Sequence, residues 1–130
     1  MKQLKITDLS VGDWVQGRIG TKAKILGIEN WSDGYALNVR ISEKDIGNVS
    51  LASAFCIPIT PQILEQNGFK ANEHSDKVYE YNEHNCLVQY FFVNHKLCIR
   101  NNNAIDVEIH SIHQLQHALR LAGINKEIIL

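Results

Sequence analysis

The chain has 130 residues, of which 45% are hydrophobic and 21% charged. This is the length of one domain with ordinary globular composition, which excludes a fibrous protein and an extensively disordered chain. The formal net charge of −1 excludes a global electrostatic attraction to nucleic acid or anionic lipid.

Features that report on the cellular compartment point to a reduced cytoplasm. The three cysteines, Cys56, Cys86 and Cys98, are an odd number without CxxC spacing, so we expect buried thiols in strands and no disulfide framework. The N-terminal residues carry no apolar signal-peptide region. Every apolar run is shorter than the roughly 20 residues that a membrane span needs, so no membrane association is expected.

Residues 1–57 are predicted to form short strands separated by turns. A Gly-Asp pair precedes a strand at Trp14-Val15, and Asp33-Gly34 is typical of a hairpin between two further strands. Tyr35 to Ile41 alternates apolar and polar residues, which indicates a strand with one buried face. We expect a turn at Asp45 to Asn48 and an SH3-like small barrel or bent sheet as the product.

Residues 58–69 are predicted to form a short helical connector. Thr60 is a suitable N-cap, Pro61 occupies the first helical position, and Asn67-Gly68 ends the helix after about two turns. The polar stretch from Asn72 to Asp76 is predicted to be a loop.

Residues 70–130 are predicted to form an antiparallel meander and one helix. The expected strands are Val78 to Tyr81, Cys86 to Val93, Lys96 to Arg100 and Ile105 to Ile109, with turns at Glu83 to Asn85, Asn94-His95 and Asn101 to Asn103.

The last helix carries the clearest local signals. Ser111 and Gln114 have the spacing of a capping box, and an apolar stripe follows at helical spacing. Gly123 is placed to end the helix in a left-handed conformation, with Ile124 folding back on Leu119. We expect the apolar residues Glu127 to Leu130 to pack or pair.

Two histidines on this helix raise a metal-site alternative. His113 and His117 have the i, i+4 spacing that allows two rings to bind one ion, and a helical wheel turns them away from the apolar stripe toward solvent. No glutamate lies between them, and no aspartate or cysteine has a ligand spacing nearby. We therefore prefer a polar, interface-facing strip and assign no metal and no cofactor.

Catalytic patterns are missing from the sequence. It contains no GxSxG elbow, no recognisable Cys–His spacing and no glycine-rich loop that opens a helix. We accordingly predict a non-enzymatic protein with no catalytic residues.

Binding is the remaining class of function. Arg18, Lys22 and Lys24 cluster beside Trp14, which is the kind of pattern that holds single-stranded nucleic acid on a small barrel. The overall charge argues against nucleic acid, and Trp14 is expected in the core because it opens an alternating strand. Trp31, in a polar stretch, is the better candidate for an exposed contact.

Three stretches resemble a known group of proteins: Leu9 to Val15, Ile59 to Phe69 and His113 to Arg120. They are similar to small proteins without an assigned activity that gut-bacterial genomes and their phages or mobile elements carry. The resemblance covers most of the chain and implies a phage or prophage setting. It transfers no catalytic or ligand-binding residue.

The sequence thus predicts a single α+β domain at 1–130, with an SH3-like part, a helix connector, a meander and a capped C-terminal helix. The predicted function is a phage or mobile-element accessory protein that binds a protein partner or assembles with itself. Alternatives are a small-ligand or nucleotide-binding protein that counters host defence by sequestration, and a single-stranded nucleic-acid module. The candidate interaction surface comprises Trp31, Tyr35, His113, His117 and Arg120.

Overall fold

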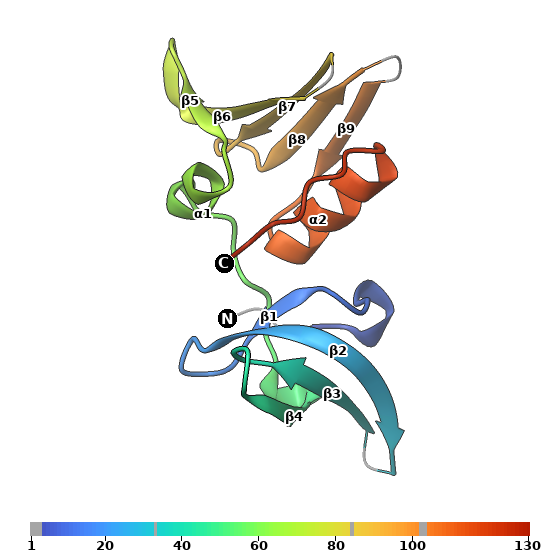
Figure 1. Ribbon diagram of the computed structural model, residues 1–130. Coiled ribbons are helices and arrows are strands. Elements are labelled where there is room, and N and C mark those ends of the chain that lie inside the picture. Colours follow the sequence, from blue (N-terminus) through green and yellow to red (C-terminus); the bar gives the residue numbers. More distant parts are fainter. Residues whose placement is uncertain (1–3, 33, 84, 102–103) are drawn as a thin grey trace. The chain divides into compact units, whose positions relative to one another are not determined.

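The computed structural model describes residues 4–32, 34–83, 85–101 and 104–130. It is a mixed α+β fold with two antiparallel sheets. The chain divides into two compact units, residues 1–57 and 58–130, each with its own sheet (Figure 1). The expectation that both belong to a single domain stays a prediction.

The first unit is built on a four-stranded sheet in the order β1-β2-β3-β4. Within the described part of the chain this sheet does not close into a barrel. Its elements are η1 (Ile6–Asp8), β1 (Trp14–Gln16), β2 (Lys22–Trp31), β3 (Gly34–Arg40), β4 (Ile46–Ser50) and η2 (Leu51–Ser53).

The hairpin expected around Asp33-Gly34 is present, because β2 and β3 are antiparallel and Trp31 lies opposite Gly34. Asp33 itself lies outside the described residues. The turn expected at Asp45 to Asn48 is wrong: β4 begins at Ile46 and pairs with β3 along its whole length. The turn lies earlier, where the amide of Ile41 donates to the carbonyl of Asp45.

A small apolar core lies on one face of this sheet. It contains Leu4, Leu9, Val15, Ala23, Ile25, Leu37, Val39 and Ala54. The strands contribute alternate residues to it, as the pleat of a sheet requires. The residues between these core positions therefore point to the opposite face of the sheet.

The second unit is built on a five-stranded meander, β5-β6-β7-β8-β9, with every neighbouring pair antiparallel. Its elements are α1 (Pro61–Gln66), β5 (Lys70–Asn72), β6 (Ser75–Glu83), β7 (Cys86–Phe91), β8 (Lys96–Arg100), β9 (Ala104–Glu108) and α2 (Ile112–Leu121). The loop expected at Asn72 to Asp76 is too long, because β5 ends at Asn72 and β6 begins at Ser75. Two expected turns include His84 and residues 102–103, which lie outside the described residues.

Both helices form where the local signals place them. The Thr60 hydroxyl accepts from the amide of Ile63, and Ser111 with Gln114 forms a capping box at the start of α2. At the end of α2, Gly123 has a φ of 76°, and the amide of Ile124 donates to the carbonyl of Leu119 at 2.9 Å. This is the predicted Schellman-type ending.

Two side-chain amides hold the C-terminal tail, residues 125–130. The Asn67 amide group exchanges two hydrogen bonds with the backbone of Ile129, at 2.7 and 2.9 Å. The Gln116 amide group bonds the carbonyl of Lys126 and the amide of Ile128. Ile128 is buried. The expectation that this segment packs or pairs is confirmed for the Ile128 side chain and for the backbone of Ile129, whose side chain is 69% exposed.

Candidate functional site

The outer face of the first sheet carries one tryptophan and three cations. Val15, Ala23 and Ile25 point into the core, so Trp14, Lys22 and Lys24 point to the opposite side. The register places Trp14 opposite Lys24, and Lys24 opposite Arg40 of β3. We call these four residues, Trp14, Lys22, Lys24 and Arg40, the Trp14 face.

Trp14 and Lys24 interact directly on this face. The Lys24 ammonium lies 5.9 Å from the centroid of the Trp14 ring, a cation–π geometry. Trp14 is half-buried and does not belong to the core cluster. The expectation of a core Trp14 is wrong because Val15, the next residue, takes the inward position.

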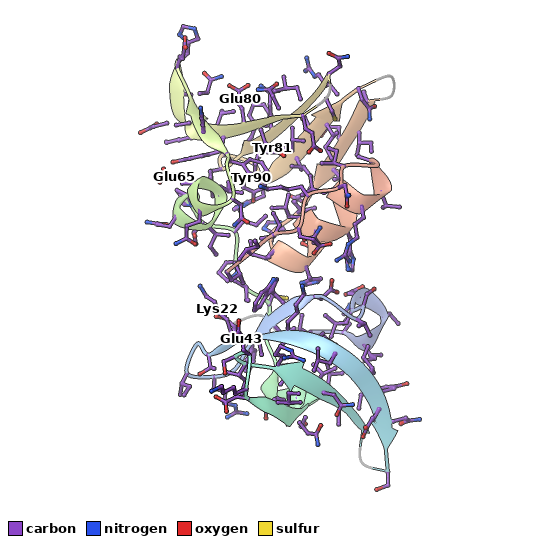
Figure 2. All side chains as sticks on the ribbon, in the orientation of Figure 1. Lys22, Glu43, Glu65, Glu80, Tyr81 and Tyr90 are labelled. Carbon is purple, nitrogen blue, oxygen red and sulfur yellow. The ribbon has the colours of Figure 1, made fainter. Side chains whose placement is uncertain are left out.

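Acidic groups near the Trp14 face make contacts of their own. The Glu29 carboxylate accepts from the Asn38 side chain at 3.0 Å, and the Asp45 carboxylate accepts from the Ser42 hydroxyl at 3.1 Å. The Arg40 guanidinium donates to the backbone carbonyl of Glu43 at 3.1 Å. Lys22 and Glu43 are labelled in Figure 2. Three cations and one carboxylate therefore belong to the strands of this face.

The sequence-predicted surface is divided between the two units. In the first unit, Tyr35 is 39% exposed in β3, opposite Asn30. Trp31 ends β2, and its side chain lies outside the described residues. The other three residues of that surface belong to α2 in the second unit.

The prediction that His113 belongs to an exposed surface is wrong. It is only 3% exposed, and its Nδ1 lies 3.1 Å from the Ser111 hydroxyl. The segment at Pro58 forms a β-bridge with Ser111, so the first turn of α2 is enclosed on more than its apolar stripe. His113 is therefore no part of an exposed surface.

The other two residues of α2 are more accessible. His117 is half-buried, and its ring meets that of His113 edge-on, with 5.9 Å between centroids. Arg120 is exposed and lies 3.4 Å from the Glu127 carboxylate of the C-terminal tail. The Arg120 guanidinium thus forms an exposed ion pair within its own unit.

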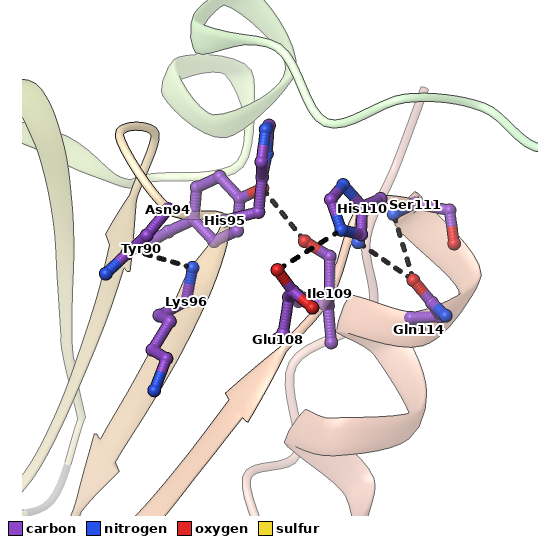
Figure 3. Close-up of polar contacts among 9 residues, drawn as sticks. All are labelled: Tyr90, Asn94, His95, Lys96, Glu108, Ile109, His110, Ser111 and Gln114. Carbon is purple, nitrogen blue, oxygen red and sulfur yellow. Dashed lines mark hydrogen bonds and ion pairs between the residues drawn. The ribbon is translucent and has the colours of Figure 1, made fainter.

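A second pair of histidines joins the β7–β8 turn to the end of β9 (Figure 3). The rings of His95 and His110 are 4.3 Å apart between centroids. The Tyr90 hydroxyl donates to the carbonyl of Ile109 at 3.0 Å and lies 3.2 Å from Nδ1 of His95. Because its one proton goes to Ile109, Nδ1 of His95 is the donor to Tyr90. Burial raises the pKa of Tyr90 to about 12.

On the open face of the second sheet, polar side chains bond one another across strands. The Glu80 carboxylate accepts from Asn72 at 2.6 Å and from Gln89 at 2.8 Å, and Lys96 pairs with Asp106. Figure 2 shows Glu80 and Tyr90 on opposite sides of this sheet. Beside Glu80 lies a cavity of about 510 Å³, lined by Gly68, Lys70, Ala71, Asn72, Glu73, His74, Glu80, Tyr81 and Asn82.

Reactive groups are sparse in the described part of the chain. Burial, together with the nearby Asp106 carboxylate, raises the pKa of the Cys98 thiol, which keeps it protonated and unreactive. Among residues 4–32, 34–83, 85–101 and 104–130, no three His, Cys, Asp or Glu side chains gather in a metal-binding arrangement. None of the described helices has both the length and the apolar character needed to cross a bilayer.

Sequence reasoning noticed Lys22 and Lys24 but not Arg40, and it placed Trp14 itself in the core. The alternation of Lys22, Ala23, Lys24 and Ile25 was the available signal, because it separates cations from core residues on one strand. Compared with protein families, with curated proteins and with solved structures, the chain shows no match to any of them.

Proposed function

We propose that this chain is a non-enzymatic accessory protein of a phage or mobile element, and that it binds a protein partner through β4. The observation that carries the proposal is an unprotected edge strand. The resemblance of three sequence stretches to proteins of gut-bacterial genomes and their phages supports the biological setting.

β4 stands at the edge of the first sheet. In an antiparallel pair, about half of the backbone groups of an edge strand point away from the neighbouring strand. Natural edges are usually blunted with lysine, proline or inward-pointing charge. The sequence of β4, Ile46-Gly47-Asn48-Val49-Ser50, has none of these.

Apolar side chains accompany this edge. Ile46 is 63% exposed and Ile41, on the other side of the β3–β4 turn, is 47% exposed. An added strand would take hydrogen bonds from the β4 backbone and cover part of the exposed Ile46 side chain, which is the mode of β-strand addition. The added strand can come from a second copy of the chain or from a different protein.

The other three edge strands are less available to a partner strand, and of these β5 has only three residues and carries Lys70. β1 carries a bridge from Gln16 to Phe55, which follows η2. This return to β1, after the 3₁₀ helix η2, supports the SH3-like description of the first unit. β9 is an edge of the second sheet and carries Asp106 and Glu108.

Strand addition at β4 is tested by placing charged side chains on that strand. We expect the variant Ile46→Lys/Asn48→Lys to remain folded, because both positions are exposed, and to lose partner capture or self-association. The readouts are light scattering after size exclusion at micromolar concentration and capture from a host lysate. The matched control is Ala104→Lys/Val107→Lys on β9, which adds the same two charges at positions that are also exposed.

A wild-type protein that stays monomeric and captures nothing contradicts the proposal. Equal loss in the β4 and β9 variants also contradicts it, because the effect would then come from charge and not from the edge.

A further inference from the structure

We propose that the Trp14 face is a binding site for single-stranded nucleic acid. This site goes beyond strand addition at β4, because it uses side chains of the outer sheet face and a different class of partner.

The positive charges form a continuous track. Lys22 and Lys24 are two residues apart on β2, so their Cα atoms are separated by about 7 Å on the same face. Arg40 continues the track onto β3. Exposed Arg18 lies in the turn between β1 and β2, beyond the Lys22 end. A spacing of two residues on an extended strand resembles the spacing of successive phosphates on an extended nucleic-acid strand.

The net charge of −1 does not oppose this site. Binding of a polyanion depends on the local field, and salt screens charges farther away than roughly 10 Å. The strands of this sheet carry one acidic residue, Glu29, whose carboxylate accepts a hydrogen bond from Asn38. The three cations of the Trp14 face therefore present a locally positive surface within a chain whose total charge is nearly zero.

Trp14 supplies the aromatic ring on which a base can stack. Single-stranded binders combine a cationic track with aromatic rings on which bases stack, and each stacked base contributes without demanding a particular sequence. The cation–π contact keeps the Lys24 ammonium next to the Trp14 ring. One nucleotide can thus place its phosphate on Lys24 and its base on Trp14.

The geometry favours single strands over duplexes. A duplex hides the faces of its bases inside the helix, so it gains nothing from an aromatic ring on a sheet surface. The cavity of about 510 Å³ is lined by residues of the second unit and is no part of the Trp14 face. An extended strand laid across the sheet fits these features best.

The experiment titrates the full chain with a fluorescein-labelled oligothymidine of roughly 16 nucleotides, long enough for one small β-domain site. Anisotropy gives the affinity and tryptophan fluorescence reports stacking. With three phosphates contacted, we expect log K to fall with log salt at a slope of about −2. The tryptophan emission should be quenched on binding.

Variants assign the effect to the face. Lys22→Ala/Lys24→Ala should weaken binding by tenfold or more and reduce the slope to about −0.7, the value for one remaining phosphate contact. Its matched control, Lys70→Ala/Lys77→Ala, removes the same charge from exposed positions of the second unit and should leave both values unchanged. Trp14→Leu should abolish the quenching and weaken binding, and Trp14→Phe should restore most of the affinity.

Three results would overturn the proposal: no binding of the oligothymidine at low salt, equal weakening by the two lysine pairs, or equal affinity for duplex DNA or heparin. If Trp14→Leu fails to fold, the lysine pairs decide, because both lie on the surface. The Ile46→Lys/Asn48→Lys variant keeps the four residues of the Trp14 face and adds two cations to the same side of the sheet, because Ile46 lies opposite Arg40 and Asn48 opposite Asn38. It should therefore bind the oligothymidine at least as tightly as the wild type even if strand addition is lost.

Discussion

The open faces of the two sheets use polar residues in opposite ways. On the second sheet, Glu80 is held between Asn72 and Gln89, and Lys96 is paired with Asp106. On the first sheet, Lys22, Lys24 and Arg40 lie together with a tryptophan and have few acidic neighbours on the strands of that face. One face satisfies its own polar groups, and the other presents charge.

This difference indicates which sheet face contributes to stability and which is available for binding. Side chains that bond one another across strands contribute to the fold and have little capacity left for a ligand. A row of like charges contributes little to the fold and retains its capacity to bind a polyanion. The second unit is thus the better candidate for a structural scaffold, and the first for recognition.

The largest effect is expected from the amides that hold the tail. Gln116→Ala removes the hydrogen bonds from the buried Gln116 side chain to the Ile128 amide and the Lys126 carbonyl, and we expect a loss of about 2–4 kcal/mol in unfolding free energy. Chemical denaturation measures it, with Gln62→Ala on the exposed side of α1 as the control. If the two units unfold separately, only the transition of the second should move. An effect below about 0.5 kcal/mol would break the contrast between scaffold and recognition surface.

A smaller effect is expected at high pH, from Tyr90. Its pKa is raised from 10.0 to about 12 by burial, so above pH 10 the folded state binds more protons than the unfolded state. Stability contributed by the neutral hydroxyl is complete below pH 10 and is lost as the pH rises toward 12. Unfolding free energies at about pH 9 and pH 11.5 should differ by up to about 2 kcal/mol because of this group.

Tyr90→Phe provides the control for this pH dependence. It removes the hydrogen bond to Ile109 at every pH, and it should flatten the decline between the two pH values. A decline of unchanged size in the variant would assign the effect to other tyrosines, such as Tyr79 and Tyr81, whose pKa values burial also raises.

The smallest effect compares the two faces directly. Glu80→Ala removes an acceptor of two hydrogen bonds and should cost about 1 kcal/mol. Lys22→Ala on the first sheet should change stability by less than about 0.5 kcal/mol. Thermal denaturation of both variants under one set of conditions measures the difference. Equal costs would show that the two faces are energetically alike.

The helices could be predicted from the sequence because their signals are local. Thr60, Ser111 with Gln114, and Gly123 each act within four residues of their position, so a linear sequence contains the whole interaction. β4 was missed because Gly47 and Asn48 are typical of turns. Its strand conformation depends on pairing with β3, a contact between residues that local patterns do not report.

The site could be predicted only in part, for the same reason. A helical wheel places His113 toward solvent because it assumes that only the apolar stripe of α2 is covered. In the structure, Pro58 and the C-terminal tail also contact α2, away from that stripe. Trp14 was assigned to the core because an aromatic residue at a strand start usually is. Only the register, which sets Trp14 beside Lys24, identifies it as part of a charged face.

The hydrogen bonds from the Asn67 and Gln116 side chains to the C-terminal tail have an evolutionary consequence. Both amides bond main-chain atoms, which every amino acid except proline offers in the same form. Substitutions at Lys126, Glu127 and Ile129 should therefore be tolerated during divergence, provided that Ile128 keeps its apolar bulk. Related chains would then retain the two amides while the tail they recognise drifts in composition.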